Sequence, residues 1–181
     1  YDPAYRAKNE VGVTLCIPGA MHANLIFAES VEYHRMIGFG HYYLGVHHPW
    51  DSKEMKAFQE LLAPYIESGF VSLHSTDIKG LKFGDESKQF FMHQCLYHSK
   101  RVASWSAVWD IDELLIPHIL GKTVEDVINA YTRKGQDDIC FVQFSSYSVA
   151  SKDPAGVKSP WLGQRFYMRD AQSNEVWKKS I

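Results

Sequence analysis

Residues 105–117 read Trp-Ser-Ala-Val-Trp-Asp-Ile-Asp-Glu-Leu-Leu-Ile-Pro, and this stretch decides the fold. Its first five residues, 105–109, are mostly apolar and predict a buried strand, because a continuous apolar run is typical of parallel sheets. Three carboxylates, on Asp110, Asp112 and Glu113, follow within four residues. Ligands of open α/β sheets bind at the carboxyl ends of the strands, so the sequence predicts a ligand site here.

Three neighbouring carboxylates repel one another unless a cation or a proton compensates them. Alternate residues of a strand-end turn point the same way, so Asp110 and Asp112 can share one hard cation. Oxygen ligands with open water positions suit Mg²⁺ or Mn²⁺ rather than zinc, and such a metal usually completes its shell with substrate phosphates. The alternative is that both aspartates only cap the turn. An EF-hand is excluded, because the glycine and glutamate that its loop requires are missing.

The rest of the chain alternates strands and helices. We expect strands at 11–17, 41–46, 70–73 and 105–109, and helices at 24–37, 52–63 and 86–99. Pro18-Gly19 is a turn signal, and Ser52 is the expected N-cap of the second helix. Later elements are a helix at 123–133, opened by a Thr123/Asp126 capping box, and strands at 139–144, 165–168 and 175–181. This order predicts an α/β fold with a mainly parallel sheet flanked by helices.

The composition is that of an ordinary globular domain. The 181 residues are 45% apolar and 22% charged, and a net charge of −2 gives no case for nucleic acid or an anionic membrane as a partner. The chain starts at Tyr1 and stops inside an expected strand, so we expect a single domain that lacks its C-terminal part, with any membrane anchor outside it. Cys16, Cys95 and Cys140 form no zinc motif, and their disulfide state is left open.

Three parts of the chain resemble one known family. Residues 110–117 resemble the "D-x-D-E-F-hydrophobic-x-P" signature of glycosyltransferase family 92, formerly a domain of unknown function. Residues 29–38 and 41–44 are similar to its "E-W-hydrophobic-E-Y-H-x-x-L-G-hydrophobic-x-H-F-Y" motif. Gln89 with Cys95-Leu96-Tyr97 is similar to a family helix that carries a glutamine and an Asp-Cys-Leu run.

The end of the chain, Lys179-Ser180-Ile181, also looks like the start of the family's "K-S-I-V-x-P" strand. Two positions depart from the family's usual residues. Ser30 stands in place of tryptophan, and Gln94 stands in place of an aspartate one helix away from the acidic strand end.

This resemblance implies a GT-A-like, Rossmann-like catalytic domain. Asp110 and Asp112 would hold Mn²⁺, or Mg²⁺, against the diphosphate of a UDP-sugar donor, where the metal neutralises the leaving UDP. The family implies an inverting transfer, usually of galactose, to a glycan acceptor by a lumenal domain of the Golgi membrane. Such a transfer needs a carboxylate base. The C-terminal part offers Asp153, Asp170 and Glu175, but no base is assigned, because it can also lie beyond Ile181.

Further donor-binding candidates come from the same motifs. Besides Asp110, they are Glu113, Glu29, Glu32, Gln89, His93 and Lys179. Each also has a purely structural interpretation. Glu29 and Glu32 can favour the N-terminal half of their helix and pair with Arg35. Gln89 and His93, four residues apart, can form a polar helix face, and Lys179 can be solvated.

Two other function classes stay open from sequence. A phosphatase of the haloacid dehalogenase type also has Asp-x-Asp after a strand and would use Asp110 as nucleophile. Such enzymes normally carry the motif on the first strand, whereas here it follows about 100 residues of other units. A non-catalytic sugar- or protein-binding module with a degenerate transferase fold is the second alternative.

Overall fold

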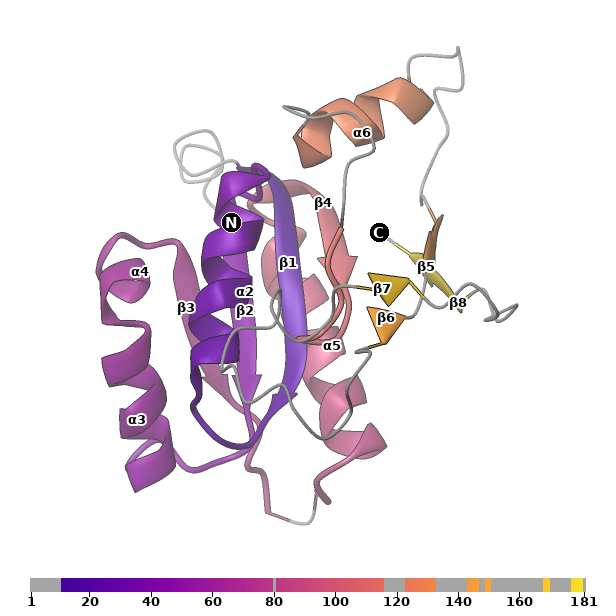
Figure 1. Cartoon of the computed structure of the whole chain (residues 1–181). Coiled ribbons are helices and arrows are strands. Elements are labelled where there is room, and N and C mark those ends of the chain that lie inside the picture. The colour runs from indigo at the N-terminus through magenta and orange to yellow at the C-terminus, as the bar shows by residue number, and fades with distance from the viewer. Residues whose placement is uncertain are drawn as a thin grey trace.

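The computed structural model describes residues 11–79, 81–115, 123–132, 143–146, 149–150, 168–169 and 177–180. Its centre is a four-stranded sheet with the order β3-β2-β1-β4, in which every neighbouring pair is parallel (Figure 1). The strands are β1 (Val11–Ala20), β2 (His41–Val46), β3 (Val71–Ser75) and β4 (Ala103–Val108). The predicted α/β fold with a parallel, Rossmann-like sheet is therefore confirmed.

Helices connect these strands and cover both faces of the sheet. They are α2 (Leu25–Met36), α3 (Lys53–Leu61), α4 (Ala63–Glu67), α5 (Asp85–Ser99) and α6 (Val124–Thr132). Leu15 of β1 belongs to the main apolar cluster, together with Phe27 of α2 and Phe58 of α3. Its neighbour Cys16 points to the other face and packs with Phe91 of α5. This alternation along β1 gives three layers, with the sheet between α2 and α3 on one side and α5 on the other.

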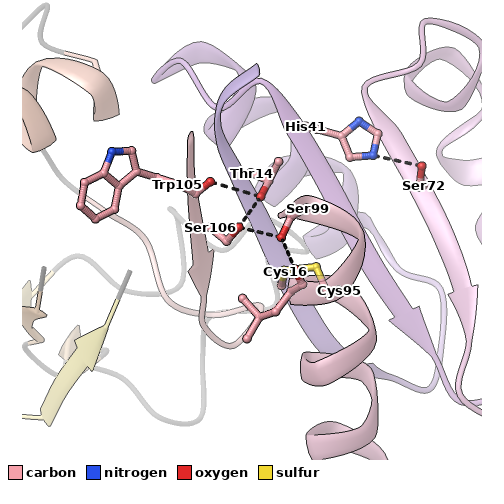
Figure 2. The surroundings of a disulfide bond; sticks show 9 residues. Thr14, Cys16, His41, Ser72, Cys95, Ser99, Trp105 and Ser106 are labelled. Atoms are coloured by element: carbon pink, nitrogen blue, oxygen red, sulfur yellow. Dashed lines mark hydrogen bonds between the residues drawn. A yellow bond between two sulfur atoms is a disulfide. The ribbon is translucent and has the colours of Figure 1, made fainter. Parts of the chain in front are cut away.

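A disulfide joins α5 to the centre of the sheet. Cys16 and Cys95 are both buried and bonded to each other, a pairing that the sequence left open (Figure 2). A chain of hydroxyl groups runs beside it, in which Thr14 donates to Ser106 at 3.2 Å and Ser106 donates to Ser99 at 2.7 Å. These contacts connect β1, β4 and α5.

The close approach of α5 also requires a glycine in β2. A Cβ atom on Gly45 would lie 2.7 Å from the ring of Phe91, which is closer than real side chains come. Glycine is therefore used here to let the helix pack directly against the backbone of the strand.

Most expected elements are found near their predicted bounds. Ser52 caps α3 by accepting from the Met55 amide at 3.0 Å. Thr123 and Asp126 form the predicted capping box, since each side chain accepts a hydrogen bond from the other's backbone N–H. The short helix α4 was not predicted. It begins directly after α3, with a proline in its first turn.

The turn predicted at Pro18-Gly19 was wrong, because β1 continues through it to Ala20. The register with β2 shifts between Ile17 and Ala20, and Gly19 has φ +79°. The two residues therefore make an irregularity within the strand, which a glycine in the left-handed region allows.

β4 is less buried than predicted. It ends at Val108 rather than residue 109, and its burial is mostly partial, with Ser104 exposed and Ala107 buried. The reason is its place as the last strand in the sheet order.

The C-terminal strands form two small antiparallel pairs. β5 (Gln143–Ser146) pairs with β8 (Trp177–Ser180), which lies close to β4, and β6 (Val149–Ala150) pairs with β7 (Met168–Arg169). They overlap the three strands predicted there only in part. Among the described residues, no helix has the length and apolarity needed to cross a membrane.

Candidate functional site

The three carboxylates lie in a tight turn at the carboxyl end of the sheet. We call residues 110–115 the acidic turn. The Trp109 amide still donates to the Cys16 carbonyl at 3.4 Å, so the β1–β4 ladder continues to the edge of this turn. Within it, the Glu113 amide donates to the Asp110 carbonyl at 3.0 Å, and the Asp110 amide donates to Glu113 Oε2 at 2.8 Å. Glu113 therefore stabilises the turn itself.

Lys88 supplies a positive charge to the acidic turn. Its Nζ lies 3.0 Å from Oδ1 of Asp110, and both side chains are about two-fifths exposed, at 37% and 42%. The lysine comes from the first turn of α5, and its stem passes over Gly19, where a Cβ atom would lie 3.2 Å from Lys88 Cε. The ends of β1 and β4 and the start of α5 thus lie together at this point. The ammonium group of Lys88 compensates part of the negative charge for which the sequence predicted a cation.

The remaining carboxylate of the pair, on Asp112, is exposed. Its neighbour Ile111 packs against the main apolar cluster, so the turn alternates between the core and solvent as expected. Two carboxylates that face water fit Mn²⁺ or Mg²⁺, because these ions keep several waters or phosphate oxygens as ligands. Within the described part of the chain, no group of three or more His, Cys, Asp or Glu side chains could hold a metal. A metal at this turn would thus rely on water or substrate oxygens for the rest of its shell.

A buried histidine lies behind the acidic turn. Trp109 Nε1 donates to His34 Nε2 at 3.3 Å, and His34 Nδ1 lies 2.7 Å from the Ser30 carbonyl. An indole N–H only donates, so Nε2 must accept and the proton must sit on Nδ1. His34 is fully buried, and this burial lowers its pKa to about 4. The neutral histidine therefore holds the residue that opens the acidic turn.

Tyr33 holds the other end of the same turn. Its hydroxyl donates to the Leu115 carbonyl at 2.6 Å, and burial raises the pKa of this tyrosine. The network continues inward, where Ser30 Oγ lies 3.1 Å from the Tyr42 hydroxyl. Burial also raises the pKa of Tyr42.

The two glutamates of α2 lie elsewhere on the helix. Glu32 pairs with Arg35 at 2.7 Å, as the structural interpretation predicted. The pKa of Glu32 is lowered first by the hydrogen bond from Arg35, and a hydrogen bond with Tyr65 of α4 also lowers it. Glu32 thus faces α4, whereas its neighbour Tyr33 faces the acidic turn. Glu29 is half-buried on the same helix, and the donor-binding role of both glutamates stays a prediction.

Gln89 and His93 are exposed on α5, on the side away from the buried residues Phe91 and Cys95. Lys179 lies in β8 opposite Phe144 of β5. The roles predicted for these three residues stay predictions. The three carboxylates considered as the base, Asp153, Asp170 and Glu175, lie outside the described residues.

Gln94, which stands where the family usually has an aspartate, lies in the second half of α5. It follows Lys88 by six residues, which corresponds to about 9 Å along a helix. Its Oε1 is buried, and no described residue is its hydrogen-bond partner. The substitution is therefore in the helix–sheet interface, well below the acidic turn.

Sequence reasoning missed the contacts that hold the turn. Tyr33 and His34 lie inside the quoted "E-Y-H" motif, and Lys88 directly precedes Gln89, yet none was given a role. The position of Lys88 in the first turn of a helix was a usable signal, because that end of α5 faces the carboxyl edge of the sheet. The hydrogen bond between His34 and Trp109 joins residues 75 positions apart and left no local signal.

The chain was also compared with known proteins. The model of glycosyltransferase family 92 matches residues 11–177, which include the whole parallel sheet, α5 and the acidic turn. No curated protein matches the chain.

Proposed function

Because the chain belongs to glycosyltransferase family 92, we propose that it transfers a sugar, galactose first of all, from a UDP-sugar to a glycan acceptor. The observation that carries this proposal is the acidic turn at the carboxyl end of a parallel sheet, where such folds bind nucleotides. We propose that the diphosphate of the donor binds there.

Asp110 and Asp112 would hold the Mn²⁺ or Mg²⁺ ion of this site. When bound, the metal supplies positive charge against the charge that develops on the leaving UDP. Lys88 places a second positive charge 3.0 Å from Asp110 Oδ1. Glu113 closes the turn that carries both aspartates.

The other expected groups act on the donor and the acceptor. Glu29, Glu32, Gln89, His93 and Lys179 stay candidates for contacts to the nucleotide or sugar. An inverting transfer also needs a carboxylate that removes the proton of the acceptor hydroxyl as the new bond forms. Asp153, Asp170 and Glu175 are the candidates for this base.

The disulfide supports the expected compartment. Cys16 and Cys95 are bonded in the core, and such bonds persist in oxidising compartments such as the secretory pathway. We therefore propose that the domain works in the lumen of the Golgi.

Calorimetric titration with UDP, with and without Mn²⁺, tests the donor site. We expect metal-dependent UDP binding that Asp112→Asn removes. Glu60→Gln, which removes one exposed negative charge from α3, should leave UDP binding unchanged. Absence of metal-dependent UDP binding in the unaltered protein would contradict the proposal.

Two further assays separate the rival functions. Metal-dependent UDP binding without transfer of galactose to any glycan acceptor would favour a non-catalytic module. Hydrolysis of an aryl phosphate that is lost in Asp110→Asn would favour the phosphatase.

A further inference from the structure

Two consecutive residues of α2 hold both ends of the acidic turn. His34 accepts a hydrogen bond from the indole of Trp109, the residue just before the turn. Tyr33 donates to the carbonyl of Leu115, the last residue of the turn. Neighbours on a helix point about 100° apart, so these two side chains can reach two points of one short segment.

The contact at the start of the turn is buried and closely packed. Trp109 is 5% exposed, and its ring packs edge-on against Phe39, with ring centroids 5.5 Å apart. His34 meets the same Phe39 ring edge-on at 5.4 Å, and the Ser30 carbonyl fixes its other nitrogen. The backbone that enters the acidic turn is therefore anchored in the core of the protein.

The contact at the end of the turn is a single strong hydrogen bond. The Tyr33 hydroxyl lies 2.6 Å from the Leu115 carbonyl, and both residues are partly buried. Between the two contacts, the Asp110–Glu113 hydrogen bonds close the turn on itself. The segment that carries Asp110 and Asp112 is thus fixed at both ends, although Asp112 itself faces solvent.

We propose that Tyr33 and His34 are positioning residues of the donor site, which hold Asp110 and Asp112 in the arrangement that binds the metal and the diphosphate. This inference rests on the proposed function. A turn that is already ordered loses less conformational entropy when a ligand binds. Contacts of this kind around a metal site typically change metal affinity by about 10-fold to 100-fold.

Tyr33→Phe tests the proposal with little change in packing, because it removes only the hydroxyl. We expect it to weaken binding of Mn²⁺ alone roughly tenfold, measured on the full chain by electron paramagnetic resonance of the free ion. It should also speed hydrogen exchange of the amides in the acidic turn. In a transfer assay, KM for the UDP-sugar should rise more than kcat falls.

Tyr65→Phe is the matched control. It also deletes one tyrosine hydroxyl, but that hydroxyl bonds with Glu32 on the α4 side of α2 rather than with the acidic turn. We expect unchanged Mn²⁺ affinity and unchanged hydrogen exchange in the turn. Trp109→Phe, which removes the indole donor to His34, should weaken Mn²⁺ binding as Tyr33→Phe does.

Mn²⁺ affinity and hydrogen exchange in the acidic turn together distinguish a failure of the positioning role from a failure of the proposed metal site. Equal Mn²⁺ affinity and equal exchange in Tyr33→Phe and the unaltered protein would overturn the positioning role. If the unaltered protein binds no Mn²⁺ while Tyr33→Phe speeds exchange in the turn, the metal site fails and the two-point attachment of the turn stands.

Discussion

The face of the sheet under α2 and α3 is one large apolar cluster that also buries His34, whereas the face under α5 is small and cross-linked. The α2 face continues into the acidic turn through Trp109 and Leu115. The α5 face reaches that turn through the partly exposed Lys88. This difference suggests that the α5 face secures the fold, whereas the α2 face sets the geometry of the site.

Removing the disulfide is the strongest test of this division. Cys16 and Cys95 close a loop with a sequence separation of 79 residues, so the double substitution to alanine should lower the free energy of unfolding by about 4 kcal/mol. Urea unfolding measures this loss. Mn²⁺ affinity should stay unchanged below the new melting transition, because the α2 contacts remain.

Reduction of the unaltered protein serves as the control for that experiment. Dithiothreitol should lower its Tm as the double substitution does, and should leave the Tm of the double variant unchanged. A large loss of Mn²⁺ affinity in the double variant would instead mean that the α5 face also holds the acidic turn.

Lowering the pH should reduce the free energy of unfolding through His34, which is buried in the α2 face. Its pKa is about 4 in the folded protein and ordinarily 6.5, so between these values the unfolded chain binds a proton that the folded chain does not. Stability is therefore complete above pH 6.5 and decreases as the pH falls toward 4, by about 3 kcal/mol at most for this group. Urea midpoints from pH 7.5 to pH 4.5 measure the decrease.

A second histidine, the partly buried His74, allows the effect of low pH on the two faces to be compared. Burial, and then the nearby His98 and His41, lower the pKa of His74 to about 4, and its ring packs against Phe91 of α5. Protonated His34 carries a hydrogen on Nε2, so this nitrogen can no longer accept the hydrogen bond from the Trp109 indole. Loss of that bond should speed hydrogen exchange in the acidic turn. In His74→Asn this acid effect on the turn should persist, and its disappearance there would assign the effect to the α5 face.

Lys88→Gln should have a smaller effect, with the opposite sign. Removing the ammonium leaves Asp110 without its compensating charge, so Mn²⁺ alone should bind roughly threefold tighter, in line with the modest energy of exposed ion pairs. Titration of Mn²⁺ measures this change. Lys100→Gln, at the far end of α5, is the control, and it should not alter the affinity. Weaker binding in Lys88→Gln would mean that the lysine stem over Gly19 supports the turn.

The same division explains what the sequence could predict. The strand at Ala103–Val108, the Ser52 cap and the Thr123/Asp126 box follow from local patterns, because apolar runs and capping residues act within a few positions. The acidic end of β4 was also found from its local composition. The contacts that hold it were not, because Tyr33 and His34 meet residues that are 82 and 75 positions away. Such pairings depend on the angle and position at which α2 packs on the sheet, and local residue patterns do not predict that packing.

Glu32→Gln should have the smallest effect on stability and on Mn²⁺ binding. It therefore provides a comparison with Tyr33→Phe, the neighbouring position on α2. Glu32 and Arg35 form an exposed pair, and such pairs contribute little to stability. Because Glu32 faces α4, the Tm and the Mn²⁺ affinity should both stay unchanged, while Tyr33→Phe one residue later weakens Mn²⁺ binding. A rise in KM for the UDP-sugar at unchanged Mn²⁺ affinity would place Glu32 against the donor, and an unchanged KM would remove it from the donor-binding candidates. The first outcome would separate a residue that contacts the sugar nucleotide from one that orients the acidic turn.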